Sequence, residues 1–133
     1  MPTLQASSAR RRPRAARKGR ALIGIKRVYD DLGPADGLRI LIDRLWPRGV
    51  SKAALKLDAW PRTLSPSNEL RTWYGHDPAR FAEFRRRYRK ELEAHTDELK
   101  ALRASIKGQR ATLLTATREL DLSHAMVLRE MLK

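Results

Sequence analysis

Apolar side chains alternate along one segment in the first half of the chain, LRILIDRLWPRG at residues 38–49. Leu38, Ile40 and Ile42 fall on one face of an extended backbone there, and Leu41 and Leu45 fall on the other. Because both faces are apolar, the pattern predicts a central strand that is covered on both sides. The charged residues, proline and glycine that follow predict a turn at the carboxyl end of this strand, where ligands bind in open α/β sheets.

Two other segments, at residues 22–29 and 111–116, are rich in β-branched residues and predict strands. Apolar residues at helical spacing, preceded by capping residues, predict helices that begin near Ser51, Ser67, Asp77, Thr96 and Ser123. This order is typical of a small three-layer α/β domain, with a central short sheet of about three or more strands flanked by helices. Only about eight residues connect the first two strands, so these are either antiparallel or parallel through an irregular link.

The positive charge of the chain is divided unevenly. The 133 residues carry a net charge of +14, and half of it comes from residues 1–20, which contain seven basic residues and no acid. Such a segment cannot bury enough apolar surface to fold, so we expect residues 1–20 to be a disordered basic tail. Residues 21–133 are expected to form a single α/β domain, because their number suits one hydrophobic core.

The composition excludes several classes of protein. The chain has no cysteine, which rules out disulfides, thiolate nucleophiles and Cys-based zinc sites. No apolar run approaches the roughly 18 residues of a membrane span, and no apolar segment follows the basic N-terminus as in a signal peptide. We therefore expect a cytoplasmic protein with no membrane partner, with a transit peptide as the alternative interpretation of the tail.

Arginines lie near the carboxyl end of every predicted strand. Arg27 lies late in the first strand, and Arg118 follows the third. Arg44 and Arg48 follow the second strand. If the strands end at the same edge of the sheet, these guanidinium groups converge, and their planar shape suits phosphate and carboxylate. The alternative is that each arginine is neutralised by a nearby acid, the candidates being Asp30, Asp43, Glu119 and Asp121.

Aromatic and titratable side chains lie close to the same strand ends in the sequence. The candidate aromatic walls of a binding site are Tyr29, Trp46 and Trp73. Asp43 and His124 are candidates for a catalytic base or for an orienting pair, and His76 is a candidate ligand-binding residue. A structural hydrogen-bonding role is the alternative for both histidines. No metal-ligand spacing, glycine-rich phosphate loop or nucleophile elbow occurs, so the sequence identifies neither a cofactor nor a reaction.

These residue blocks carry a family resemblance. The chain resembles the YeaO-like family of small bacterial proteins, a domain of unknown function (488), across about residues 25–132. The most specific match is DRLWPRG at residues 43–49, and KRVYD at 26–30 and HDP at 76–78 match as well. The resemblance implies a compact α/β domain and no established activity. Ser123 replaces the Asn that usually precedes the family's histidine, so an Asn–His pair is absent.

Two functional hypotheses follow from these patterns. We expect the protein to bind or act on an anionic small molecule, phosphate- or nucleotide-like, through the arginines at the strand ends. The alternative is a nucleic-acid-associated protein that uses residues 1–20 and a basic helix face containing Arg86, Arg87 and Arg89. No helix-turn-helix, RNP or zinc-finger signature supports that alternative. The patterns do not specify an oligomeric state.

Overall fold

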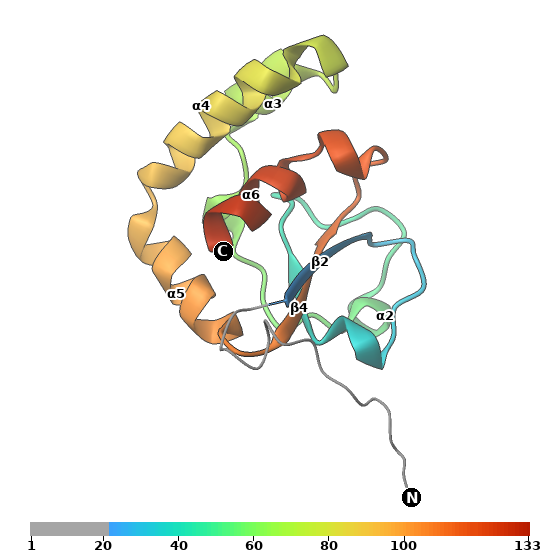
Figure 1. Cartoon of the computed structure of the whole chain (residues 1–133). Helices are drawn as coiled ribbons and strands as arrows, with labels where there is room; N and C mark the ends of the chain where they lie inside the picture. The colour runs from blue at the N-terminus through green and yellow to red at the C-terminus, as the bar shows by residue number, and fades with distance from the viewer. Residues whose placement is uncertain (1–21) are drawn as a thin grey trace, which may run out of the picture.

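Three parallel strands form the sheet of the computed structural model, which describes residues 22–133. β4 (Arg110–Thr115) is the middle strand, with β2 (Leu22–Arg27) on one side and β3 (Leu38–Leu41) on the other. The tail predicted at residues 1–20 lies outside the described residues. The sheet and the helices that flank it confirm the predicted α/β fold (Figure 1).

The prediction that the segment beginning at Leu38 forms the central strand is wrong. β3 lies at an edge, because β4 is inserted between the two strands that precede it in the sequence. The outer edge of β3 is partly covered by Ala59, which forms an isolated bridge with Ile40 and accepts a hydrogen bond from the Leu41 nitrogen at 3.1 Å. Both earlier strands run parallel to β4, so all three carboxyl ends lie at the same edge of the sheet.

Helices connect and cover these strands. The α-helices within residues 22–133 are α2 (Lys52–Leu55), α3 (Asn68–Tyr74), α4 (Phe81–Glu93), α5 (Thr96–Ile106) and α6 (His124–Leu132). Short 3₁₀ turns occur at Pro34–Asp36, Arg62–Leu64, Pro78–Arg80 and Leu120–Leu122. In this part of the chain, no helix has the length and apolar character needed to cross a bilayer.

Capping serines begin two of the helices as predicted. The hydroxyl of Ser51 accepts a hydrogen bond from the Ala54 nitrogen at 3.0 Å, and that of Ser67 accepts one from the Leu70 nitrogen at 3.1 Å. Ser123 occupies the same position before α6, but its hydroxyl makes no capping bond and instead donates to the backbone oxygen of the preceding 3₁₀ turn at 2.7 Å. The N-terminus of α6 therefore has no side-chain cap.

The sheet separates two apolar layers of unequal size. On one face, Ala111 and Leu113 of β4 pack with side chains of α3, α4, α5 and α6. On the other face, Leu114 packs with Leu41 and with Leu55 of α2. All residues of β4 after its first are buried, as expected for a strand covered on both faces. The predicted three-layer arrangement is thus formed, with the larger helical layer on one side.

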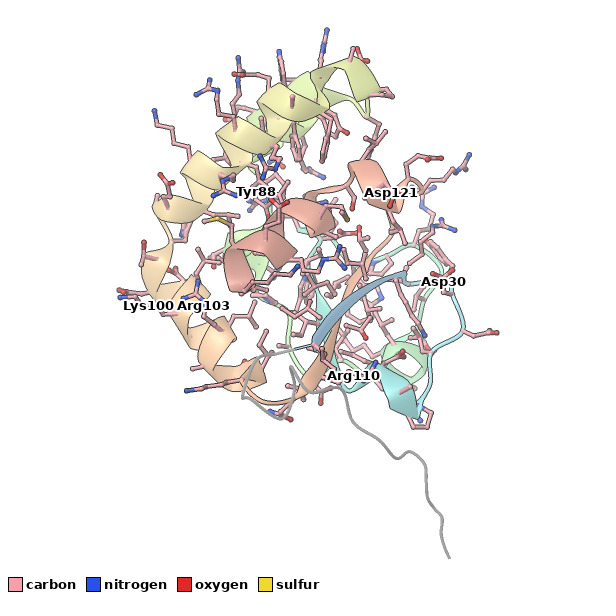
Figure 2. All side chains as sticks on the ribbon, in the orientation of Figure 1. Asp30, Tyr88, Lys100, Arg103, Arg110 and Asp121 are labelled. Atoms are coloured by element: carbon pink, nitrogen blue, oxygen red, sulfur yellow. The ribbon has the colours of Figure 1, made fainter. Side chains whose placement is uncertain are left out.

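The helical spacing of Phe81, Phe84, Tyr88 and Leu92 predicts one apolar face of α4, and three of these side chains are buried while Phe81 is half-buried. Phe84, Tyr88 and Leu92 recur at a spacing of four residues and are each at most 2% exposed. Figure 2 shows Tyr88 among the interior side chains, while charged groups project from the outer surface of the helices. The Tyr88 hydroxyl donates to the backbone oxygen of Leu64, so this buried polar group is satisfied.

Leu45 departs from the alternation that assigned it to a buried face. Its side chain is 65% exposed. The strand ends at Leu41, and the backbone turns within the following residues, so the two-residue periodicity no longer determines which side Leu45 faces. The prediction of burial is therefore wrong for this residue, which lies instead at the carboxyl edge of the sheet.

Candidate functional site

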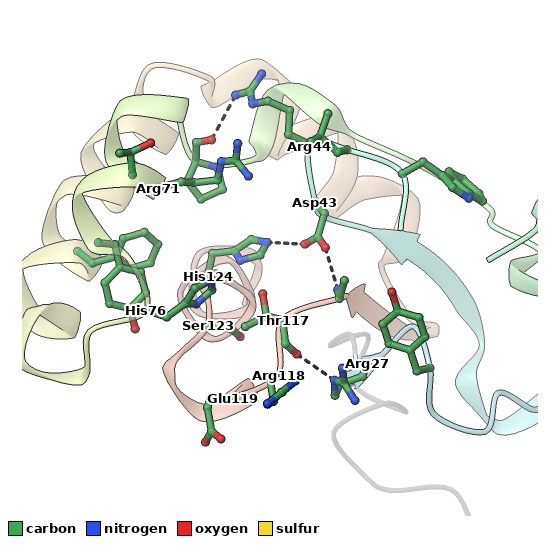
Figure 3. Close-up of a pocket in the computed structure, with 18 residues that line it drawn as sticks. Arg27, Asp43, Arg44, Arg71, His76, Thr117, Arg118, Glu119, Ser123 and His124 are labelled. Atoms are coloured by element: carbon green, nitrogen blue, oxygen red, sulfur yellow. Dashed lines mark hydrogen bonds and ion pairs between the residues drawn. The ribbon is translucent and has the colours of Figure 1, made fainter. Parts of the chain in front are cut away.

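A cleft of about 910 Å³ opens at the carboxyl edge of the sheet (Figure 3). Its lining comes from residues that follow each of the three strands, from α3 and from the start of α6. Small-molecule sites typically occupy about 300–1,000 Å³, so the volume suits a metabolite-sized ligand. Eight of the ten predicted site residues line it: Arg27, Tyr29, Asp43, Arg44, Trp46, His76, Arg118 and His124.

Asp43 links the end of β3 to the end of β4 and to α6. Its Oδ1 accepts a hydrogen bond from the Thr115 hydroxyl at 2.7 Å, and its Oδ2 accepts one from the Ala116 nitrogen at 2.8 Å. The Nε2 atom of His124, the first residue of α6, lies 3.0 Å from Oδ1. Both carboxylate oxygens are therefore occupied by groups of the protein, and Asp43 pairs with a histidine rather than with an arginine.

Two tryptophans fix the turn that carries Asp43. Trp60 donates from Nε1 to the backbone oxygen of Asp43 at 2.7 Å, and Trp46 donates from Nε1 to the backbone oxygen of Val50 at 2.6 Å. Their ring centroids lie 5.4 Å apart in an edge-to-face arrangement. The DRLWPRG segment is thus held by indole hydrogen bonds and aromatic packing, which keeps the carboxylate at the edge of the cleft.

The surroundings of Asp43 change its acidity in two opposing ways. Burial raises the pKa of the carboxyl group. The hydrogen bond and positive charge of His124, together with the Ala116 and Thr115 donors, outweigh burial and lower the pKa of Asp43 below its ordinary value. The folded state therefore favours the ionised carboxylate more than the unfolded chain does.

This shift predicts a pH dependence of stability. A carboxyl group whose pKa is lower in the folded state stabilises the fold above its unfolded pKa, roughly 3.9 for Asp, and loses that contribution as the pH falls through the folded pKa. We expect the free energy of unfolding of the wild type to exceed that of Asp43→Asn at pH 6, and the difference to shrink steadily below about pH 4. Urea denaturation of the wild type and of Asp43→Asn at several pH values measures this difference in the free energy of unfolding. A difference that stays constant down to pH 2 would show that Asp43 ionisation does not stabilise the fold.

The imidazole of His124 is held in one orientation by two acceptors. Nε2 lies 3.0 Å from Asp43 Oδ1 and 3.2 Å from the backbone oxygen of Ile42. Since both neighbours accept hydrogen bonds, the geometry assigns the hydrogen to Nε2. Within residues 22–133, Nδ1 has no hydrogen-bond partner. Asp43 thus orients His124, and Nδ1 is the ring nitrogen that makes no hydrogen bond within the described residues.

Four arginines line the cleft, and Figure 3 shows them in two pairs on opposite sides of Asp43 and His124. Arg44 and Arg71 lie on one side, and Arg27 and Arg118 lie on the other. Within the described residues, none of the four guanidinium groups forms an ion pair with a carboxylate. The structure therefore does not support the alternative in which neighbouring acids neutralise these arginines.

Arg27 and Arg44 instead contact backbone oxygens, and Arg27 also lies against an aromatic ring. Arg27 donates from Nε to the backbone oxygen of Thr117 at 3.2 Å, and its guanidinium carbon lies 5.1 Å from the Tyr29 ring centroid. Arg44 donates from Nη2 to the backbone oxygen of Pro66 at 3.3 Å, while its buried Nε has no partner among the described residues. Four arginines and two acids, Asp43 and Glu119, line the cleft, so the formal net charge of its lining is positive.

A protein-family model described as "Inactive DUF488-N3 subclade" matches residues 22–133, the whole of the described chain. The chain belongs to this family. The YeaO-like resemblance seen in the sequence is thereby confirmed. No solved structure matches the chain.

Two relatives of the DUF488 protein show how far the similarity extends. The uncharacterized protein YeaO of Escherichia coli (strain K12) is 43% identical over 111 residues, which cover 84% of this chain and 96% of YeaO. An uncharacterized protein of Mycobacterium tuberculosis (strain ATCC 25618 / H37Rv) is 43% identical over 110 residues, covering 83% of this chain and 92% of the relative. The family model, which matches residues 22–133, includes the sheet and the cleft.

Two predicted site residues of this DUF488 domain do not line the cleft. Arg48 is exposed, and its backbone oxygen accepts a hydrogen bond from the Tyr29 hydroxyl at 3.0 Å. Trp73 packs against the larger apolar layer, with the Arg87 guanidinium carbon 4.3 Å from its ring centroid. Both residues were predicted at the site because they are close to it in the sequence. The turn after β3 directs Arg48 away from the cleft, and α3 directs Trp73 away from it.

Sequence reasoning also missed residues that line the cleft of the DUF488 domain. Thr117 lies two residues beyond the end of β4, and its position directly after the predicted strand at 111–116 was a usable signal. Arg71 lies in α3, far in the sequence from any strand end, and only the packing of α3 beside the sheet edge brings it to the cleft. No local pattern distinguishes Arg71 from the other surface arginines.

Proposed function

We propose that the domain binds an anionic small molecule in this cleft, with Arg27, Arg44 and Arg118 contacting the anionic group. The observation that carries the proposal is the set of cleft arginines without carboxylate partners within residues 22–133, at the carboxyl edge of a parallel sheet. The four arginines outnumber Asp43 and Glu119 in the lining, and a phosphate or carboxylate would balance the excess positive charge.

The chemistry of arginine favours a phosphate or carboxylate ligand over a chloride-like ion. A guanidinium group presents paired N–H donors in a plane and binds two oxygens of the same group at once. A hydrogen bond to a charged group contributes roughly 1.5–3 kcal/mol. Two or three such contacts contribute roughly 3–9 kcal/mol together, and an association entropy of at least about 4 kcal/mol opposes them, so these contacts alone support a dissociation constant of about 0.1 mM or weaker.

Asp43 and His124 would position the ligand in this proposal. Asp43 already accepts hydrogen bonds on both oxygens, which makes it an orienting group rather than a free base. His124 would offer Nδ1 to the ligand, as an acceptor when neutral and as a donor when protonated. The word "inactive" in the description of the family model favours binding over turnover.

A thermal-shift screen of the full chain against phosphorylated metabolites, pyrophosphate and dicarboxylates tests the proposal. We expect at least one of these anions to raise the unfolding temperature, and Arg118→Ala to weaken its binding about 10- to 100-fold because one charge-assisted contact is lost. Arg118 is exposed, so the substitution should leave the stability of the free protein unchanged.

Arg48→Ala is the matched control for that experiment. It removes the same charge from an exposed position in the neighbourhood of the cleft but outside its lining. We expect this variant to bind as the wild type does. Equal losses in Arg118→Ala and Arg48→Ala would indicate attraction by net charge alone and would contradict a defined anion site.

The alternative of nucleic-acid binding depends on residues 1–20. On α4, Arg86 and Arg87 pair with Glu83 at 2.6 and 2.7 Å, and Arg85 pairs with Glu130 at 2.7 Å, which leaves that helix face partly neutralised. Replacing the basic residues of 1–20 by serine in the full chain separates the hypotheses. Loss of DNA binding with retained small-anion binding would confine nucleic-acid affinity to the tail.

A further inference from the structure

Two large apolar side chains stand out on the surface of residues 22–133. Tyr29 is 49% exposed and Leu45 is 65% exposed, whereas the other large hydrophobic residues of this part of the chain are buried or half-buried. Both residues line the arginine-lined cleft, although they come from different strand ends. An apolar surface at a charged site is unfavourable in water, so its presence there points to a ligand with an apolar part.

The ring of Tyr29 is held in a fixed position. Its hydroxyl donates to the backbone oxygen of Arg48 at 3.0 Å, and the Arg27 guanidinium carbon lies 5.1 Å from the ring centroid. A cation on one side of the ring and a hydrogen bond at its tip restrict both side-chain torsions. A ligand that stacks on this ring would therefore pay little additional side-chain entropy.

We infer that the ligand is a mononucleotide, whose base stacks on Tyr29 beside Leu45 while its phosphate binds the cleft arginines. The inference rests on the proposed anion site and adds the second half of the ligand. A sugar phosphate would leave both exposed apolar side chains uncovered. A planar base matches the flat ring, and nucleobases stack on aromatic side chains whatever their identity. The cleft volume of about 910 Å³ accommodates base, sugar and phosphate together.

Calorimetric titration of the full chain with matched probes tests this inference. The probes are the four ribonucleoside 5′-monophosphates, the corresponding nucleosides and ribose 5-phosphate, which keeps the sugar and phosphate but lacks the base. We expect at least one nucleotide to bind about tenfold more tightly than ribose 5-phosphate, the usual contribution of one stacked base. The nucleosides should bind more weakly than the nucleotides, because they lack the anion.

Variants at Tyr29 identify the stacking surface. Tyr29→Phe keeps the ring and should retain most of the tenfold preference for the nucleotide. Tyr29→Leu keeps an apolar side chain without a flat face and should bind the nucleotide and ribose 5-phosphate equally. Because Tyr29 is about half exposed, both variants should fold, and their unfolding temperatures provide the check.

The possible outcomes separate this inference from the proposed function. Equal affinity of the wild type for ribose 5-phosphate and every nucleotide would overturn the inference and leave the anion site standing. An undiminished preference in Tyr29→Leu would also overturn it. Binding of a short single-stranded oligonucleotide without binding of any mononucleotide would replace the small ligand by nucleic acid. Failure of every phosphate compound to bind would reject the anion site and the inference together.

Discussion

Replacing Gly37 with alanine is expected to lower the free energy of unfolding by about 4 kcal/mol, a large part of the stability of a small domain. Gly37 has a φ of 67°, a conformation that residues with a Cβ rarely adopt. A Cβ at this position would also overlap the backbone carbonyl group of Arg110, the first residue of the middle strand. Because that neighbour is backbone within the sheet, it cannot rotate away as a flexible side chain would.

Urea denaturation followed by circular dichroism measures the effect of Gly37→Ala, with Gly24→Ala as the control. Gly24 lies in β2, and a Cβ there would make only an ordinary contact, 3.8 Å from Thr112 Oγ1. We expect Gly24→Ala to change stability by less than about 1 kcal/mol. If the two variants unfold at the same urea concentration, the close approach of Gly37 to the middle strand is not a constraint on the fold.

Replacing Asp43 with alanine should cost about 3 kcal/mol of stability. The substitution removes the acceptor of the Ala116 nitrogen and the Thr115 hydroxyl, and one of the two acceptors of His124 Nε2, at the junction of β3, β4 and α6. An unsatisfied buried donor costs roughly 1–3 kcal/mol, and the partial exposure of Asp43 lets water replace some of the lost contacts. The expected value is therefore well below the sum of three full penalties.

Asp43→Asn and Asp121→Ala make this measurement specific. Asparagine has the size of aspartate, but its side-chain NH₂ group would face one of the hydrogen-bond donors that now bind the carboxylate. We therefore expect Asp43→Asn to lower the free energy of unfolding by about 2 kcal/mol. Asp121 is an exposed carboxylate, and Asp121→Ala should change stability by no more than about 0.5 kcal/mol. Wild-type stability in Asp43→Ala would show that Asp43 does not hold these elements together.

Local patterns in the sequence were sufficient to predict most of the elements. The four-residue spacing of Phe84, Tyr88 and Leu92 identified the buried face of α4, and the serines at 51 and 67 identified the starts of two helices. These features depend on residues within one or two turns of each other, so composition and spacing determine them. The same holds for Arg27, Arg44 and Arg118, whose convergence required only that the strands be parallel.

Features that depend on distant pairing could not be predicted. The insertion of β4 between β2 and β3 joins segments more than 65 residues apart in the sequence. An edge strand that is covered by a loop has the same apolar pattern as a central strand, so residues 38–41 alone do not show which of the two they form. The contact of Asp43 with His124 spans 81 positions. The exposure of Leu45 and the separation of Arg48 from the cleft follow from the path of one turn, which strand periodicity does not describe.

An NMR titration of the full chain with pyrophosphate tests the central claim, an anion site at the carboxyl edge of the sheet, most directly. We expect saturable shifts of the backbone amide signals of Ala116, Thr117 and His124, which lie at the cleft. The dissociation constant should rise at least tenfold in Arg118→Ala and stay unchanged in Arg48→Ala. Shifts that do not saturate, or that occur only among residues 1–20, would contradict the claim and leave the cleft arginines without an anion-binding role.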